Sequence, residues 1–158
     1  METCSDGGYA TGFKLKVQGA QGSWYDDTAL NSICLVCSRG DEICSTQGWY
    51  GGWGTAKNEN KDPKETCEEG FSASKLRVEK WVNKADNTGA NNLYLYCKDK
   101  ESTEFATTNG GPWGDWYERT CHNGNVICGL RTKIRSYAGW ADDTSLSGVQ
   151  FQCCEDIW

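Results

Sequence analysis

A short stretch of sequence recurs three times along the chain, and this repeat constrains the fold more than any other feature. The copies, called Asp boxes below, read Asp-Asp-Thr-Ala-Leu-Asn at 26–31, Asp-Asn-Thr-Gly-Ala-Asn at 86–91 and Asp-Asp-Thr-Ser-Leu-Ser at 142–147. A cysteine follows the first aspartate by 11 residues in every copy, and successive copies are offset by 60 and 56 residues. Self-similarity of this kind is typical of a fold built from equivalent structural units.

Each Asp box is preceded by a segment with the alternation of a half-buried β-strand. Apolar side chains alternate with charged ones around 13–17, 76–79 and 130–135. This two-residue period predicts strands with one buried face and one solvent-exposed face. Glycine accounts for 19 of 158 residues, and turn signals such as Asn123-Gly124 recur. We therefore predict an all-β domain in which three antiparallel sheets share one core around a pseudo-threefold axis.

The chain is predicted to form one domain, because the repeat continues from one end to the other. The domain covers 1–158, with repeats at roughly 4–54, 67–116 and 121–154. The polar segment 57–65 is predicted to be a loop insertion and not a linker.

The chain has ten cysteines and one histidine, and this composition indicates disulfide bonds and not a zinc-binding site. The single CxxC joins Cys34 to Cys37 in a predicted strand, where residues three apart point to opposite faces and cannot share a metal. Positions within the repeats and around the turn near Gly40 predict three pairs: Cys4–Cys37, Cys67–Cys97 and Cys34–Cys44. Cysteine usage also predicts a secreted, extracellular protein.

Charge and motif content exclude several classes of function. The formal net charge is −6, with an isoelectric point of about 4.8, so we expect neither nucleic acid nor an anionic membrane as a partner. No apolar stretch approaches transmembrane length. No nucleotide-binding, hydrolase or metalloprotease motif is present, so we expect no cofactor and no metal ion.

The repeats carry a resemblance to a known family. The first Asp box, the strand Gly-Phe-Lys-Leu-Lys-Val at 12–17, the segment Gly-Pro-Trp-Gly-Asp-Trp at 111–116 and the ending Cys153-Cys154 resemble the vitelline membrane outer layer protein I family over nearly the whole chain. The resemblance implies a β-prism of three Greek-key sheets, in a secreted protein of an egg coat or another extracellular layer. It also implies a connection with sugars, because a transferase-like activity on chito-oligosaccharides is attributed to this family. No settled catalytic residues come with it.

The resemblance and the repeat give different pairings for the last four cysteines. The family pattern implies a nested arrangement, Cys121–Cys154 and Cys128–Cys153. Alignment of the three repeats alone gives Cys121–Cys153, and this alternative stays open.

The Asp boxes allow a catalytic and a structural interpretation. In the first, aspartates converge on a cleft, where two carboxylates about 5 to 9 Å apart can act on a glycosidic bond. In the second, Asp and Thr cap a tight turn by bonding local backbone N–H groups. Catalytic sites seldom occur three times, and Asn87 and Ser147 break the equivalence of the copies, so we favour the structural interpretation. Calcium is a minor third option.

Two tryptophans are the candidates for binding sugar. Trp24 and Trp140 each lie two residues before an aspartate pair, whereas repeat two has Lys84 at that place. Such a ring can stack on a pyranose face while the neighbouring carboxylates accept hydrogen bonds from hydroxyl groups. The alternative is that both rings only cover the sheet edge. The candidate carbohydrate-binding residues are Trp24, Asp26, Asp27, Trp140, Asp142 and Asp143.

The remaining side chains suggest no chemistry of their own. Trp53, Trp113 and Trp116, in segments where Trp adjoins Gly, are expected to pack in the core. His122 alone cannot provide a general base with a credible nucleophile. We therefore expect a non-catalytic coat protein that binds extracellular glycans or coat glycoproteins. The alternative is a weak glycosyltransferase or glycosidase acting on N-acetyl-chito-oligosaccharides.

Overall fold

The computed structural model describes residues 1–19, 30–48, 51–58, 65–80, 89–134 and 146–155. Within these ranges the chain is almost entirely β-strand, with one short 3₁₀ turn at Ser5–Gly7 and no helix that could cross a membrane. The strands are β1 (Glu2–Thr3), β2 (Ala10–Val17), β3 (Leu30–Cys37), β4 (Glu42–Cys44), β5 (Gly52–Thr55), β6 (Lys57–Asn58), β7 (Phe71–Val78), β8 (Ala90–Cys97), β9 (Glu104–Ala106), β10 (Asp115–Thr120), β11 (Val126–Ile134) and β12 (Leu146–Cys154).

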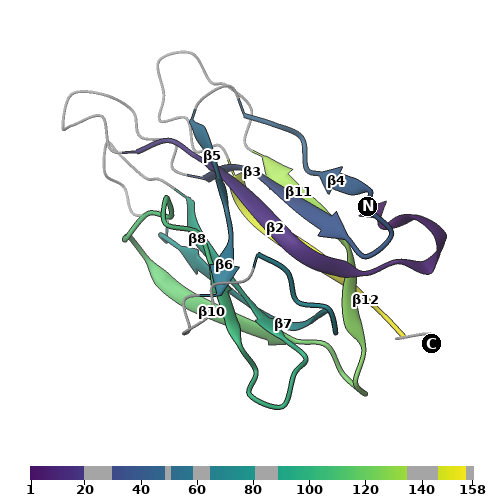
Figure 1. Ribbon diagram of the computed structural model, residues 1–158. Helices are drawn as coiled ribbons and strands as arrows, with labels where there is room; N and C mark the ends of the chain where they lie inside the picture. Colours follow the sequence, from purple (N-terminus) through teal and green to yellow (C-terminus); the bar gives the residue numbers. More distant parts are fainter. Residues whose placement is uncertain (20–29, 49–50, 59–64, 81–88, 135–145, 156–158) are drawn as a thin grey trace, which may run out of the picture.

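The strands form three antiparallel sheets, as the repeat predicted. Sheet 1 has the order β4-β3-β2-β5, sheet 2 the order β10-β7-β8-β9-β6, and sheet 3 the order β1-β11-β12. In sheets 1 and 2, three consecutive strands are followed by a fourth that returns beside the first, which is the Greek-key arrangement. Figure 1 shows sheet 2 at lower left and sheet 1 at upper right, with β11 and β12 partly behind sheet 1.

The central hairpins of the three sheets have the same register, so they are structurally equivalent. The hairpins β2–β3, β7–β8 and β11–β12 each contain two shifts in the pairing register. One lies near the start of the first strand, and the other lies beside the pair closest to the connection between the two strands. These last pairs are Val17↔Leu30, Val78↔Ala90 and Ile134↔Leu146. Three equivalent hairpins are consistent with the predicted β-prism.

The N-terminal strand completes sheet 3. The first strand of each hairpin has an outer neighbour, which is β5 beside β2 and β10 beside β7. In sheet 3 that place beside β11 is taken by β1, with Glu2 opposite Leu130 and Thr3 opposite Gly129. The start of the chain thus joins the sheet that the end of the chain builds.

One apolar core lies between the sheets. Three phenylalanines, Phe13, Phe71 and Phe105, pack edge to face with ring centroids 6.0 and 5.2 Å apart, and all are nearly inaccessible to solvent. In β2, Phe13, Leu15 and Val17 are buried while Lys14 and Lys16 are not, which confirms the alternation. In β7 and β11 the inward residues near the hairpin end, such as Leu76 and Thr132, are only half-buried.

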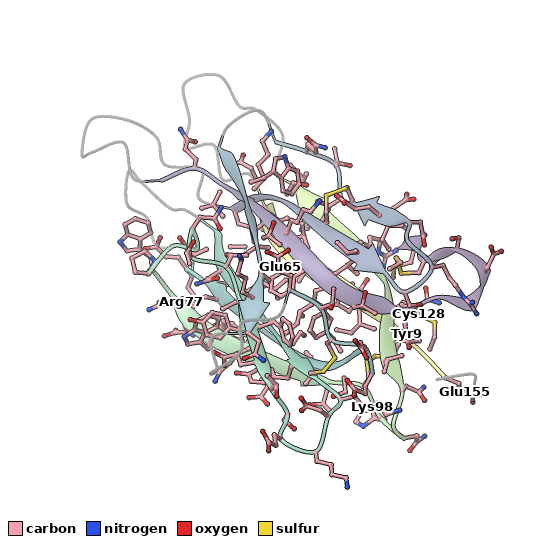
Figure 2. All side chains as sticks on the ribbon, viewed as in Figure 1. Tyr9, Glu65, Arg77, Lys98, Cys128 and Glu155 are labelled. Carbon is pink, nitrogen blue, oxygen red and sulfur yellow. A yellow bond between two sulfur atoms is a disulfide. The ribbon has the colours of Figure 1, made fainter. Side chains whose placement is uncertain are left out.

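All ten cysteines are in disulfides, drawn as yellow bonds in Figure 2 where they are visible. The pairs are Cys4–Cys37, Cys34–Cys44, Cys67–Cys97, Cys121–Cys153 and Cys128–Cys154. The first three match the prediction. The nested pairing Cys121–Cys154 and Cys128–Cys153 is wrong, and the pairing given by the repeat alignment is the one observed.

The reason for this error is the direction of side chains on a strand. Adjacent residues on β12 point to opposite faces. Cys153 occupies the position that Cys37 and Cys97 hold in the other hairpins, so it faces the cysteine that opens its repeat, Cys121. Cys154 points the other way and reaches Cys128.

The predicted burial of the tryptophans in the Trp-Gly segments is also wrong. Trp53 is 43% exposed and Trp113 is 38% exposed. Trp53 lies opposite Lys16 and shares its outward face, whereas Gly54 lies opposite Leu15 and takes the inward position. A Cβ on Gly54 would collide with the side chain of Asn109, so the small residue is the inward one.

The segment 57–65, predicted as a loop, begins with the short strand β6, which pairs with β9.

Candidate functional site

The six candidate residues lie outside the described residues. Trp24, Asp26 and Asp27 belong to the connection between β2 and β3, and Trp140, Asp142 and Asp143 to the connection between β11 and β12. Nothing in the described ranges tests whether these side chains converge. The structure does define the strand ends that hold both connections.

The second half of each Asp box forms the start of a strand and is part of the fold. Leu30, Ala90 and Leu146 are fully buried. The next residues, Asn31 and Asn91, are also fully buried, and their carbonyl groups accept hydrogen bonds from the N–H groups of Gly48 and Gly111, at 2.8 and 2.7 Å. This half of the repeat is therefore explained by packing and backbone pairing, without a ligand.

The strand ends that carry the first two boxes are joined by a polar contact between sheets 1 and 2. The side-chain amide of Asn109 donates to the carbonyl groups of Leu15 and Gly52, at 3.2 and 3.1 Å. The following residue, Gly110, packs so closely on Asn92 that a Cβ would collide with its side chain. These contacts tie the segment before β10 in sheet 2 to the strands β2 and β5 of sheet 1.

Repeat three departs from this frame. Its box ends in Ser147, which is exposed and whose hydroxyl donates to the carbonyl of Lys133 on the neighbouring strand at 3.1 Å. No glycine among the described residues docks on this strand as Gly48 and Gly111 dock on the other two. The start of β12, which follows the connection with Trp140, is therefore less enclosed than the start of β3, which follows the connection with Trp24.

A second group of aromatic residues lies on the outer face of sheet 2. The rings of Tyr94 and Trp116 are 4.4 Å apart between centroids, and the guanidinium of Arg77 lies 5.4 Å from the centroid of Trp116. Arg77 points away from the core (Figure 2), and its Nε donates to the carbonyl of Gly114 at 3.1 Å. Sequence reasoning placed Trp116 in the core and missed this cluster. Trp116 lies opposite Arg77 on the neighbouring strand β7, whose charged side chains were predicted to face water.

Neighbouring partners hold this cluster together, and the rings of Tyr94 and Trp116 are both half-buried. Tyr94 covers one side of Trp116, and Lys75, 6.0 Å from the ring centroid, adds a second cation to Arg77. The hydroxyl of Tyr96 donates to Glu104 at 2.6 Å, and burial together with this carboxylate raises the pKa of the Tyr96 phenol above its usual range. The phenol stays protonated at neutral pH and cannot act as a base.

The described residues contain no metal centre. Two groups of close ligand atoms occur, one around Cys34, Glu42 and Cys44 and the other around Cys67, Glu69 and Cys97. In both groups the sulfur atoms are already in disulfides, so they cannot act as thiolate ligands.

Comparisons with known proteins agree with the resemblance seen in the repeats. The sequence model of the family described as Vitelline membrane outer layer protein I matches residues 1–156. A human protein named Vitelline membrane outer layer protein 1 homolog is 40% identical over 158 residues, which cover 97% of this chain and 74% of the relative. The mouse protein of the same name is 38% identical over 156 residues, covering 97% and 75%.

Proposed function

Because the chain belongs to the vitelline membrane outer layer protein I family, we propose that it is a secreted component of an extracellular coat that binds carbohydrate without catalysis. The names of the human and mouse relatives refer to the outer layer of a vitelline membrane, and this supports a coat location for the present chain. The five disulfides support it independently, because disulfides persist in extracellular and other oxidising compartments.

The carbohydrate proposal rests on one observation, the tryptophan that precedes the aspartate pair in two of three equivalent hairpins. The fold uses the second half of each Asp box, and the hairpin forms in repeat two with Lys84 in place of tryptophan. Trp24 and Trp140 are therefore not needed to build the hairpin. We assign them to stacking on sugar rings, with Asp26, Asp27, Asp142 and Asp143 as hydrogen-bond acceptors.

Two such sites on one molecule favour a polymeric ligand. One stacked ring contributes about 1 to 3 kcal/mol, taking the magnitude for bases on aromatic side chains. Two sites that engage the same polymer add by avidity, because the second binding event is intramolecular. The proposed ligand class is a repeating extracellular glycan, free or attached to a coat glycoprotein.

The test is retention of purified protein on immobilised polymeric glycans. Trp24→Ala and Trp140→Ala should each weaken retention about tenfold, the effect of roughly 1.4 kcal/mol of lost stacking, and leave the melting temperature unchanged. Lys84→Ala is the matched control at the equivalent place in repeat two, and Trp116→Ala removes an aromatic ring outside the proposed site. Both controls should bind as the unmodified chain does.

Two outcomes would contradict the assignment. If retention is unchanged in both tryptophan variants, the rings do not contact the glycan. If Trp116→Ala alone abolishes retention, the binding surface is the outer face of sheet 2 and not the connections that carry the Asp boxes.

A further inference from the structure

The three sheets differ at the outer edge of the second hairpin strand. In sheet 1 this strand, β3, is covered by β4, and in sheet 2 the equivalent strand, β8, is covered by β9. Sheet 3 ends at β12, and no strand in the described part of the chain pairs with its outer edge. The equivalence of the hairpins therefore identifies a strand position along β12 that none of the described strands fills.

The strands that fill this position elsewhere share a sequence pattern. β4 reads Glu-Ile-Cys at 42–44 and β9 reads Glu-Phe-Ala at 104–106, so an acidic, a large apolar and a small residue follow one another. Ile43 lies opposite Leu35, and Phe105 lies opposite Leu95. Both Leu35 and Leu95 are fully buried.

In sheet 3 the residue equivalent to these leucines is Phe151, which pairs with Leu130 as Leu35 pairs with Phe13. Phe151 and its neighbour on the same face, Val149, are only half-buried although they pack against the core. The difference arises because the large apolar side chain that covers Leu35 and Leu95 has no counterpart here within the described ranges.

A hollow of about 460 Å³ lies beside these two residues, between β12 and the strands β7 and β10 of sheet 2. Its apolar lining includes Leu76, Val78 and Tyr117 on one wall and Val149 and Phe151 on the other. Among the described residues that line the hollow, Arg119 is the only charged one. The hollow explains why Leu76 and Val78 are less buried than their equivalents in β2.

The backbone of β12 is suited to accept a further strand. The N–H groups of Cys37 and Cys97 donate across this edge to Asp41 and Thr103, both at 2.8 Å, whereas Cys153 at the same place has no such acceptor among the residues described. β12 is nine residues long and contains no charged residue. Exposed edges are usually protected by charge, proline or short length, and β12 has none of these protections.

We propose that β12 and the adjacent hollow form a docking site for an extended peptide segment of a partner protein, which adds to sheet 3 as an antiparallel strand. The segment has the pattern of β4 and β9, an acidic residue, a large apolar residue and a small residue. The apolar side chain enters the hollow opposite Phe151, and the acidic residue next to it points to the opposite, outer face of the sheet, as Glu42 does beside Lys14 in sheet 1. Backbone pairing supplies affinity and the hollow supplies specificity, as in other cases of strand addition.

The probe is a fluorescent peptide that copies residues 102–108, Ser-Thr-Glu-Phe-Ala-Thr-Thr. It should bind the intact protein and slow the hydrogen exchange of the backbone amides of Val149, Phe151 and Cys153. A control peptide with Asp in place of Phe should bind at least tenfold more weakly. Neither readout depends on carbohydrate, so this test and the glycan test can fail independently.

Variants in the protein locate the site. Val149→Asp places a charge in the hollow and should weaken peptide binding at least tenfold, whereas Gln152→Asp places the same charge on the exposed face of the same strand and should not. Tyr117→Asp, on the opposite wall and 39% exposed in the native chain, should also weaken binding. It provides the test if Val149→Asp fails to fold.

Three results would overturn the proposal. The first is equal binding of both peptides, or exchange at β12 that the peptide does not change. The second is self-association of the protein that Val149→Asp or Tyr117→Asp abolishes, because a second copy would then occupy the edge. The third is peptide binding that appears only after residues 156–158 are deleted, because the chain itself would then fill the position.

Discussion

At the scale of single residues, two glycines determine how the outer strands return to the hairpins. Gly51 and Gly114 precede β5 and β10, and both have positive φ values, +97° and +93°. A Cβ on either would collide with the backbone carbonyl group at the end of the neighbouring strand, at Val17 and Val78. The two positions are equivalent, so the same close approach is needed in sheets 1 and 2.

Gly114→Ala should destabilise the protein more than Gly40→Ala. Gly40 has a similar φ of +91° but open space around it, so alanine there costs only the backbone strain of roughly 1 to 2 kcal/mol. At Gly114 the collision adds about 1 to 3 kcal/mol. Urea unfolding of the two variants measures the difference, and equal losses would show that the close approach is not required.

The tryptophans show where residue-level prediction fails. The turn at Asn123-Gly124 was predicted and is confirmed by φ values of +56° and +73°, because its chemistry is local. The exposure of Trp53 depends on which neighbour in the strand faces Asn109, a residue of another repeat. Hydrophobicity alone assigns tryptophan to the core, and only the packing of sheet 1 on sheet 2 reverses this.

At the scale of strands, the repeat predicts the hairpins and not the strands around them. β2, β3, β7, β8, β11 and β12 follow from alternation and from the spacing of the Asp boxes, and all are present. The strands β1 and β6 contain two residues each, too few for any period to be visible. β1 also pairs with a strand more than 120 residues away in sequence, which no local pattern can indicate.

The disulfides of the third repeat provide a test at this scale. Fragmentation of disulfide-linked peptides, with cleavage between Cys153 and Cys154, should connect Cys121 to Cys153 and Cys128 to Cys154. The register of β12 against β11 requires this pairing, because the two adjacent cysteines face opposite sides of the strand. A fragment that joins Cys121 to Cys154 would mean that β12 is rotated relative to its equivalents.

At the scale of the whole molecule, three sheets enclose one core, and most of this architecture was predictable. The repeat gives the number of sheets and the alternation gives their inner faces. The candidate binding site is different, because its six residues are named from sequence and lie outside the described ranges. The hollow beside β12 was not predictable either, since it lies beside a strand position that is filled in two sheets and that no described strand fills in the third.

The proposal of a non-catalytic protein follows from the threefold repeat. The boxes recur in three hairpins, and catalytic sites seldom occur three times in one domain. Incubation with N-acetyl-chito-oligosaccharides should therefore give no turnover by the purified protein. Turnover that Asp26→Asn or Asp142→Asn abolishes, with the melting temperature unchanged, would instead establish the glycosyltransferase or glycosidase alternative.

The most direct test of the central claim is binding of the intact, disulfide-bonded protein to an array of extracellular glycans. We expect retention on at least one repeating polysaccharide and weaker retention on its short oligosaccharides, because two sites engage a polymer together. The bound glycan should be recovered uncleaved. Folded protein that is retained by no glycan on the array would contradict the carbohydrate-binding account.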